Sequence, residues 1–219
     1  MSTTISVTGR ADEHVEPELG VLRLTVAASG QDREHVLAQV GSAHEQVLSD
    51  LRGLDAAGSL ESWSAGSLRV WSHRPWNAEG RRLPLVHEAA AEVEASFRDL
   101  DALGAWAGPA AWAESVTLEG IEWRLTEATR SRVHESAQRR AVADAVRKAG
   151  VYAEALGLAA PVPVEIADHG MPGERPVQRN HRQAPVRAMA MADAAAPAAE
   201  FAPAKLVVEA AVDARFSTQ

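Results

Sequence analysis

Histidine is the residue type of this 219-residue chain that most invites a chemical role, because the chain has eight histidines and no cysteine. A metal ion would therefore need imidazole and carboxylate ligands, and neither thiolate catalysis nor a disulfide is possible. No two histidines stand in an HExxH or HxH motif or four residues apart, the spacings that bring ligands together. This favours histidines at the surface or at strand edges, and we expect no metal site and no cofactor.

His87 is the histidine to inspect first, because it begins a stretch in which every second residue is apolar. An imidazole at such an inward-facing position either forms a structural hydrogen bond or acts as a general base. We favour the structural hydrogen bond.

Serine nucleophiles and phosphate-binding loops also lack their sequence signatures. The chain contains no G-x-S-x-G motif, and Ser64, Ser67 and Ser72 fall on one predicted strand whose alternate residues face opposite ways. The glycines of residues 170–173 are followed by neither the lysine nor the helix of a phosphate cradle. We therefore expect no catalytic residue.

Tryptophan is unusually abundant, with six tryptophans against one tyrosine. Trp63, Trp71 and Trp76 concentrate around one pair of predicted strands. Alternation places Trp63 and Trp71 opposite Leu68 and Val70, so both indoles would lie on the open face of a sheet. Aromatic side chains there commonly anchor protein contacts. Two interpretations stay open, namely self-association through these tryptophans and packing beneath residues 175–204.

Composition and charge exclude several classes of function. The chain is 46% hydrophobic and 24% charged, as in an ordinary globular protein, and its net charge of −8 disfavours binding to nucleic acid or to an anionic membrane. No run of about 18 apolar residues predicts a membrane span. The first residues lack a basic and apolar leader, so we expect a cytoplasmic protein, or an exported one if the chain is a processed form.

The first half of the chain predicts strands and one helix. Residues 5–10 and 21–28 alternate as two strands, which we interpret as a β-hairpin. Asp32 is a favourable N-cap for a helix that continues until Gly53 and Gly58. Residues 62–72 alternate again and are expected to form one strand.

Residues 87–98 contain a conflict between composition and periodicity. They are rich in helix-forming residues, yet apolar and charged residues alternate strictly from His87 to Arg98. We interpret them as a strand, because a period of two separates the glutamates from Phe97 more cleanly than a helix would. A short helix follows from Asp99, and then a strand over residues 116–125 with a bulge at Gly120.

The most regular feature of the second half is a long helix from Thr126 to Gly157. Its alanines recur every fourth residue, so small side chains form one stripe that can lie closely against a sheet. The stripe consists of Ala137, Ala141, Ala145, Ala149 and Ala153. Strands are expected at residues 162–166 and 205–216. Between them, residues 170–204 are rich in proline, alanine and methionine and are expected to form a flexible loop.

The predicted elements define an α+β class in the order ββαββαβαββ. Because each strand has one apolar face, we expect an antiparallel sheet with the helices packed on one side. Residues 21–125 contain the βαββαβ order of a ferredoxin-like unit. Length allows one compact domain or two small packed ones, and we assign residues 1–219 to a single domain.

Several features, in this order, resemble the SIMPL domain family. They are the ISVTG strand at residues 5–9, the Pro17-Glu18 turn, Gly120-Ile121 before Trp123, the alanine helix ending in Leu156-Gly157, the Met-Ala segment at 188–191 and the strand at 208–216. The resemblance spans almost the whole chain. It implies an α+β domain that is often exported, sometimes assembles into large rings or channels, and has no established catalytic residue. The missing leader departs from the family and puts the exported location in doubt.

Two functions follow as expectations. The first is a non-enzymatic, SIMPL-like protein that forms homo-oligomers and acts as a scaffold or a stress- or envelope-related accessory. The alternative is a small-molecule-binding module, or a cryptic hydrolase, with a pocket between the sheet and residues 170–204. The sequence specifies no ligand, pathway or stoichiometry for either.

Overall fold

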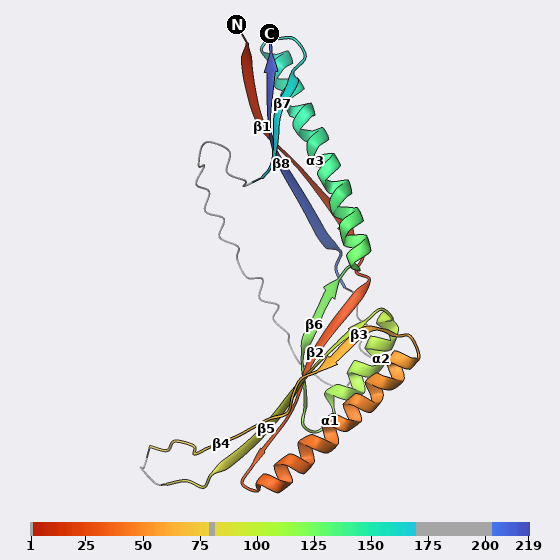
Figure 1. The fold of residues 1–219 in the computed structure, drawn as a ribbon, viewed down its shortest axis with the longest axis vertical. Coiled ribbons are helices and arrows are strands. Elements are labelled where there is room, and N and C mark those ends of the chain that lie inside the picture. The colour runs from red at the N-terminus through yellow and green to blue at the C-terminus, as the bar shows by residue number, and fades with distance from the viewer. Residues whose placement is uncertain (1, 79–81, 170–202) are drawn as a thin grey trace. The chain divides into compact units, whose positions relative to one another are not determined.

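A computed structural model describes residues 2–78, 82–169 and 203–219. These residues form two compact units (Figure 1). We call residues 16–125 the middle unit, and residues 2–15, 126–169 and 205–219 the terminal unit. The sequence analysis assigned residues 1–219 to one domain, and the structure gives each unit a hydrophobic cluster of its own.

The terminal unit is a three-stranded antiparallel sheet covered by one long helix. The strands are β1 (Thr3–Val15), β8 (Leu206–Thr218) and β7 (Val162–Asp168), in the order β1-β8-β7. The helix α3 (Glu127–Ala155) lies against β1 and β8. The predicted long helix is therefore confirmed, with Thr126 as its N-cap and Gly157 at φ +68° just beyond its end.

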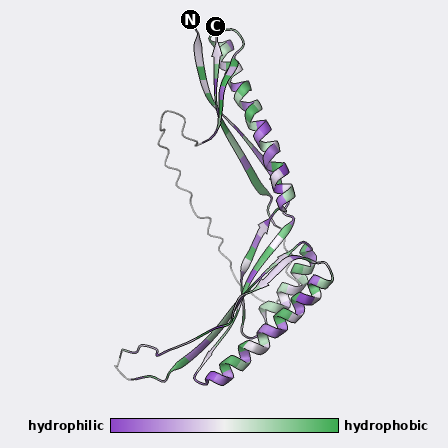
Figure 2. Ribbon diagram, in the orientation of Figure 1, coloured by the Kyte–Doolittle hydropathy of each residue, from purple (hydrophilic) through white to green (hydrophobic). Residues whose placement is uncertain are grey.

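The alanine stripe of α3 is buried along its whole length, each alanine being no more than 2% exposed. The methyl groups of the last four alanines pack with Ile5 of β1 and with Val212, Ala214 and Phe216 of β8. The closest approach is at Gly9, where an added Cβ would lie 2.0 Å from the carbonyl oxygen of Ala141. The small residues thus let α3 lie directly on the sheet, while its outer side stays largely hydrophilic (Figure 2).

The middle unit is a second antiparallel sheet, in the order β3-β5-β2-β6, with β4 pairing to β5. Its strands are β2 (Leu19–Gly30), β3 (Leu60–Ala65), β4 (Arg69–His73), β5 (Val86–Phe97) and β6 (Val116–Arg124). Two helices, α1 (Arg33–Ala56) and α2 (Leu100–Ala111), pack on it. Asp32 and Asp99 cap them, as expected, by accepting hydrogen bonds from backbone N–H groups of the first turn.

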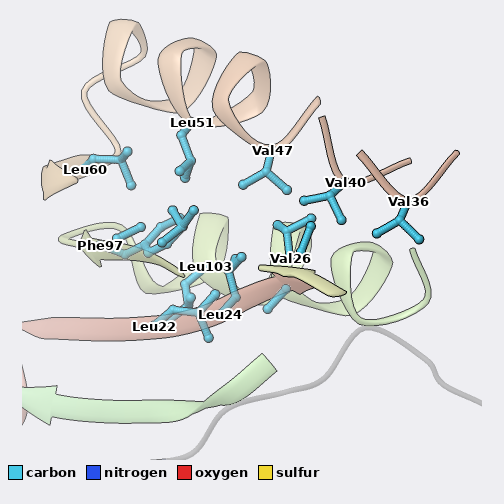
Figure 3. Close-up of a cluster of buried hydrophobic side chains, with 14 residues drawn as sticks. Leu22, Leu24, Val26, Val36, Val40, Val47, Leu51, Leu60, Phe97 and Leu103 are labelled. Atoms are coloured by element: carbon cyan, nitrogen blue, oxygen red, sulfur yellow. The ribbon is translucent and has the colours of Figure 1, made fainter. Parts of the chain in front are cut away.

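The core of the middle unit lies between α1, α2 and the sheet (Figure 3). Four residues of α1 point toward the strands, and Leu22, Leu24 and Val26 of β2 meet them from the sheet. Those four are Val36, Val40, Val47 and Leu51. Phe97 and Leu103 close the cluster at one end, where the Phe97 ring lies 6.0 Å from that of Trp106.

Residues 86–97 form strand β5, so the strand interpretation of this alanine-rich segment is confirmed. The alternate residues from Ala89 to Phe97 are buried, at 0–3% exposure, on the face that the helices cover. The bulge in β6 is also present, because the pairing with β2 shifts its register between Arg23 and Leu24. Gly120 beside the bulge has φ +137°, a conformation open to glycine.

The predicted α+β class is confirmed, since two antiparallel sheets and three helices make up the described residues. In the middle unit, α1 joins β2 to β3 while β5 lies between them. Of the helices described, none has both the length and the apolar character that crossing a membrane requires.

Two details of the predicted layout are wrong. The first two strands do not form a hairpin, because β1 pairs with β8 while β2 pairs with β5 and β6. Alternation shows which face of a strand is apolar but not which strand lies beside it. Residues 62–72 also divide into two strands, β3 and β4, where the N–H of Gly66 donates to the carbonyl of Glu92. The expected loop over residues 170–204 lies almost entirely outside the described residues.

Candidate interaction surface on the middle unit

The three tryptophans expected to form one surface are divided between two faces of the middle sheet. Trp63 pairs with Ala95 and packs, half-buried, against the core. Trp71 pairs with Glu88 on the opposite face. Ala65 pairs with Val93 of β5, and Arg69 pairs with Ala90. The two paired residues are thus four positions apart on one side of the ladder but only three apart in β5. The extra residue reverses the alternation, so the placement of Trp63 on the open face is wrong.

Trp71 and Trp76 both belong to a projecting segment that we name the cationic arm. It comprises residues 68–78 and 82–85, that is, β4 and the described residues that flank it, and β4 extends away from the helices (Figure 1). Trp71 is 44% exposed and Trp76 is 86% exposed. Three further apolar side chains of the arm are exposed, namely Leu68, Val70 and Leu85. Strand β4 is exposed at every residue from Arg69 to His73.

The arm has the opposite charge to the protein that carries it. Its described residues contain three arginines and no acidic residue, a formal charge of +3 in a chain of net charge −8. Arg69 forms an ion pair with Glu92, and Arg74 donates to the carbonyl of Leu83 at 2.7 Å. Arg82 has no ion-pair partner among residues 2–78, 82–169 and 203–219. Arginine and tryptophan side chains therefore share this exposed segment.

His87 lies at the base of the arm and forms a hydrogen bond across the strand ladder. It pairs with Ser72 of β4, and its Nδ1 lies 2.7 Å from the Ser72 hydroxyl oxygen. His73, the next residue of β4, lies 3.0 Å from a carboxylate oxygen of Glu88. A nucleophilic triad needs a third group that orients the base, and in the described part of the chain Ser72 is the partner of this ring. The arrangement attaches β4 to β5.

An open hollow of about 310 Å³ lies on the face of the middle sheet away from the helices. Arg23 in its lining donates to Glu94 at 2.8 Å and to Glu122, which lies outside the lining, at 3.1 Å. These two hydrogen bonds raise the pKa of the Arg23 guanidinium. The hydroxyl of Thr25 donates to Glu119 at 2.6 Å. The hollow therefore offers a ligand few polar groups that are not already engaged.

A metal centre finds no support within the described ranges, where no three His, Asp or Glu side chains are grouped to hold an ion. The alternative pocket beneath residues 170–204 lies outside those ranges.

The strongest electrostatic feature of the terminal unit is structural. Lys148 Nζ lies 2.6 Å from Asp144, and the backbone N–H of Arg10 donates to the same carboxylate at 3.0 Å. These contacts and Arg147 lower the pKa of Asp144 well below its usual range.

Helix α2 carries a second exposed surface that the sequence analysis did not identify. Its buried side consists of Leu103, Gly104 and Ala107. Small apolar residues face outward, and the helix ends at Trp112, which is 77% exposed. We name the exposed residues at this site the α2 face, which consists of Asp101, Ala105, Pro109, Ala111, Trp112 and Glu114. The available signal in the sequence was that alanines occur on both the buried and the exposed side of α2, as Ala107 and Ala105 show.

The sequence comparisons agree with this architecture. A family model described as "SIMPL: Protein of unknown function (DUF541)" matches residues 5–216, nearly the whole chain. Among curated proteins, none matches the chain. The matched residues begin within β1, end within β8 and include the entire middle unit. The chain belongs to the SIMPL family.

Proposed function

We propose that this protein is a non-enzymatic scaffold that associates with further copies of itself through the cationic arm. The supporting observation is the exposure of five large apolar side chains on one projecting segment. Such a cluster is unusual on a monomer, because the burial of apolar surface is favourable by a free energy of about 25 cal/mol per Å². A second copy of the chain is the simplest partner for this cluster, because it is present wherever the protein is.

The composition of the arm also fits a protein interface. Tryptophan and arginine are enriched at the residues that dominate binding energies, since both combine a large apolar area with directional polar groups. The arm supplies Trp71 and Trp76 together with Arg74 and Arg82. Its positive charge is attracted to the rest of the protein, which is strongly acidic, so another copy is favoured electrostatically as well.

Light scattering on the purified protein tests this function. We expect the wild-type protein to have a mass of two or more chains at micromolar concentration. The double variant Trp71→Ala/Trp76→Ala should shift the mass toward that of one chain, because truncation at an interface centre costs about 2 kcal/mol or more per residue.

The control for that experiment is Tyr152→Ala, an exposed aromatic residue of α3 in the terminal unit. It removes a ring of similar size away from the arm and should leave the mass unchanged. A wild-type protein that is monomeric at micromolar concentration, or an assembly that is indifferent to both tryptophans, would refute the proposed function.

A further inference from the structure

Side chains of α3 hydrogen-bond to the outer edge of β1, the edge that faces away from β8. The three contacts are Lys148 Nζ to the Thr8 carbonyl at 2.9 Å, the Arg10 N–H to Asp144 at 3.0 Å, and Arg140 to the Asp12 carbonyl at 3.4 Å. Backbone groups of successive strand residues point to opposite sides, so residues 8, 10 and 12 all turn theirs outward. Along this part of β1, α3 therefore takes the place of a further strand.

The spacing of these contacts shows which α3 residues lie beside the rest of the edge. From one contact to the next the helix advances four residues, about 6 Å, and the strand goes back two residues, about 7 Å. The next two steps place Tyr152 beside Ser6 and Leu156 beside Thr4. Each of these α3 residues follows an alanine of the buried stripe by three positions, so all of them lie on the same side of the helix.

The edge of β1 is open at Ser6 and Thr4, which we call the open end of β1. Both residues are exposed, and their outward backbone groups receive no side chain of α3 among the described residues. Tyr152 and Leu156 are 53% and 65% exposed, so the side of α3 that is charged beside residues 8–12 is apolar here. An unpaired strand edge thus adjoins an exposed apolar patch.

Lys148 stands at the border between the bonded part of the edge and the open end. A lysine ammonium has three N–H groups, and the contacts with Thr8 and Asp144 use two of them. Arg147 contacts the same carboxylate, so two cations share one anion at this border. The border therefore attracts a further negative charge.

We propose that the open end of β1 binds an extended peptide of another protein, which adds to the terminal sheet as a fourth strand. Backbone N–H and C=O groups at strand spacing are complemented by another strand, and unpaired edges are the usual place for such addition. All the strand pairs described in both sheets are antiparallel, and we assign the same direction to the peptide.

The alternation of β1 specifies which residues the peptide should carry. Peptide residues opposite Ser6 and Thr4 form the backbone hydrogen bonds, and those opposite Ile5 and its neighbours face the side that α3 covers. Two apolar residues on that side would reach Tyr152 and Leu156, and an acidic residue two positions earlier would reach the border cations. The recognised sequence is therefore acidic-x-apolar-x-apolar, read from its N-terminus.

Fluorescence anisotropy with a labelled, end-capped pentapeptide and the full chain tests this contact. The probe is Glu-Thr-Val-Thr-Val, for which we expect saturable binding. The reversed peptide Val-Thr-Val-Thr-Glu has the same composition and alternation but places its glutamate away from Lys148. It should bind roughly tenfold more weakly, because the charges then no longer match.

Methylation of backbone nitrogens tests the strand addition itself. The two threonines of the probe are the residues opposite Ser6 and Thr4, so their N–H groups face β1. N-methylation of both threonines should abolish binding. N-methylation of both valines, whose N–H groups face away from β1, should leave the affinity within about twofold of that of the probe.

Adjacent residues of α3 provide a matched pair of protein variants. Tyr152→Asp places a charge beside the open end and should weaken peptide binding roughly tenfold or more. Val151→Asp makes the same change at a residue that is 52% exposed but two positions after Ala149, on the side of the helix away from the sheet. It should leave binding unchanged. Circular dichroism confirms that both variants keep their helices.

This contact does not rest on the proposed self-association, because the open end belongs to the terminal unit and the arm to the middle unit. The variant Trp71→Ala/Trp76→Ala should therefore bind the probe as the wild type does. Absence of binding to the wild-type protein overturns the contact, as do equal affinities of the two N-methylated peptides or of the two α3 variants. If Tyr152→Asp instead lowers the mass of a wild-type assembly, then a second copy occupies the edge and the peptide contact is wrong.

Discussion

At the scale of single residues, Gly9 decides how closely α3 approaches the terminal sheet. An added Cβ at this position would lie 2.0 Å from the Ala141 oxygen and 2.8 Å from the Ala145 methyl carbon. Two of the three nearest atoms are backbone atoms of α3, which leaves little room to adjust, because this helix is packed against the sheet. Glycine is required here because α3 leaves no room for a side chain, whereas the neighbouring residues of β1 follow the alternation of buried and exposed positions.

We therefore expect Gly9→Ala to destabilise the protein by about 1–3 kcal/mol, the usual cost of adding a methyl group to a filled interface. Gly41→Ala is the matched control, since a Cβ at Gly41 in α1 meets nothing within 4 Å and removing a helix glycine stabilises by up to about 1 kcal/mol. Urea titrations followed by circular dichroism measure both. Equal effects of the two substitutions would show that α3 does not lie so close to β1.

Asp144 is the residue whose ionisation contributes most clearly to stability. Its pKa is lowered in the folded protein, first by Lys148, then by the Arg10 N–H group and Arg147. A depressed pKa means that the unfolded chain binds the proton more tightly. The stabilisation is therefore complete above the usual carboxyl pKa of about 4 and is lost as the pH falls below it.

Asp144→Asn should consequently be less stable than the wild type at pH 7, and the difference should shrink as the pH falls from about 5 toward 2. Unfolding free energies at a series of pH values measure this convergence. Glu127→Gln, at an exposed site in the first turn of the same helix, provides the comparison. A difference that stays constant with pH would contradict the role given to Asp144.

At the scale of elements, periodic patterns predicted which face of each segment is buried. The alanine stripe of α3, the alternation from His87 to Phe97 and the caps Asp32 and Asp99 are local signals, and the structure confirms all of them. Each depends on residues within one or two turns of the chain. Local physics therefore determines the type of an element and its buried face.

The partners of the elements were not predictable in the same way. Thr3 pairs with Thr218, a partner from the far end of the sequence, and no pattern in β1 specifies it. The single extra residue between Ala65 and Arg69 reversed the faces of Trp63 and Trp71. Exposure of Trp76 and Trp112 also depends on what other elements leave uncovered. The candidate surface could thus be predicted in residue type but not in position.

Helix α3 offers a direct test of the packing that the alanine stripe implies. Ala145 is 1% exposed beneath the sheet, and Val146 beside it is exposed. Ala145→Leu should cost about 1–3 kcal/mol, because three extra carbons enter a filled interface. Val146→Leu should change stability by less than about 0.5 kcal/mol. Thermal melts of the two variants measure the contrast, and similar melting temperatures would place the stripe elsewhere than against β1 and β8.

At the scale of the whole molecule, the chain contains two units with separate cores and separate optical reporters. All six tryptophans lie within residues 16–125, whereas the single tyrosine, Tyr152, lies in α3. Tryptophan fluorescence therefore reports on the middle unit alone, and circular dichroism reports on both units. The two signals need not change together when one core is weakened.

We expect Gly9→Ala to lower the midpoint of the circular dichroism transition more than that of tryptophan fluorescence. The reason is that Gly9 packs in the cluster of the terminal unit, and the fluorescent residues lie in the other cluster or on its surface. Parallel urea titrations with both probes measure the two midpoints. Midpoints that shift by the same amount would mean that the two units unfold as one cooperative body.

The charge distribution connects the whole molecule to its proposed assembly. A net charge of −8 keeps copies apart on average, while an arm of +3 gives each copy one point of attraction. Association between such surfaces weakens as salt screens the charges, because the Debye length falls from about 30 Å at 0.01 M to about 3 Å at 1 M. The proposed self-association should therefore be sensitive to ionic strength.

Light scattering of the wild-type protein, over a range of protein and salt concentrations, tests the central claim most directly. We expect a mass of two or more chains at micromolar protein and low salt, and a shift toward one chain as the salt concentration approaches 1 M. A mass of one chain under all of these conditions would contradict self-association through the arm.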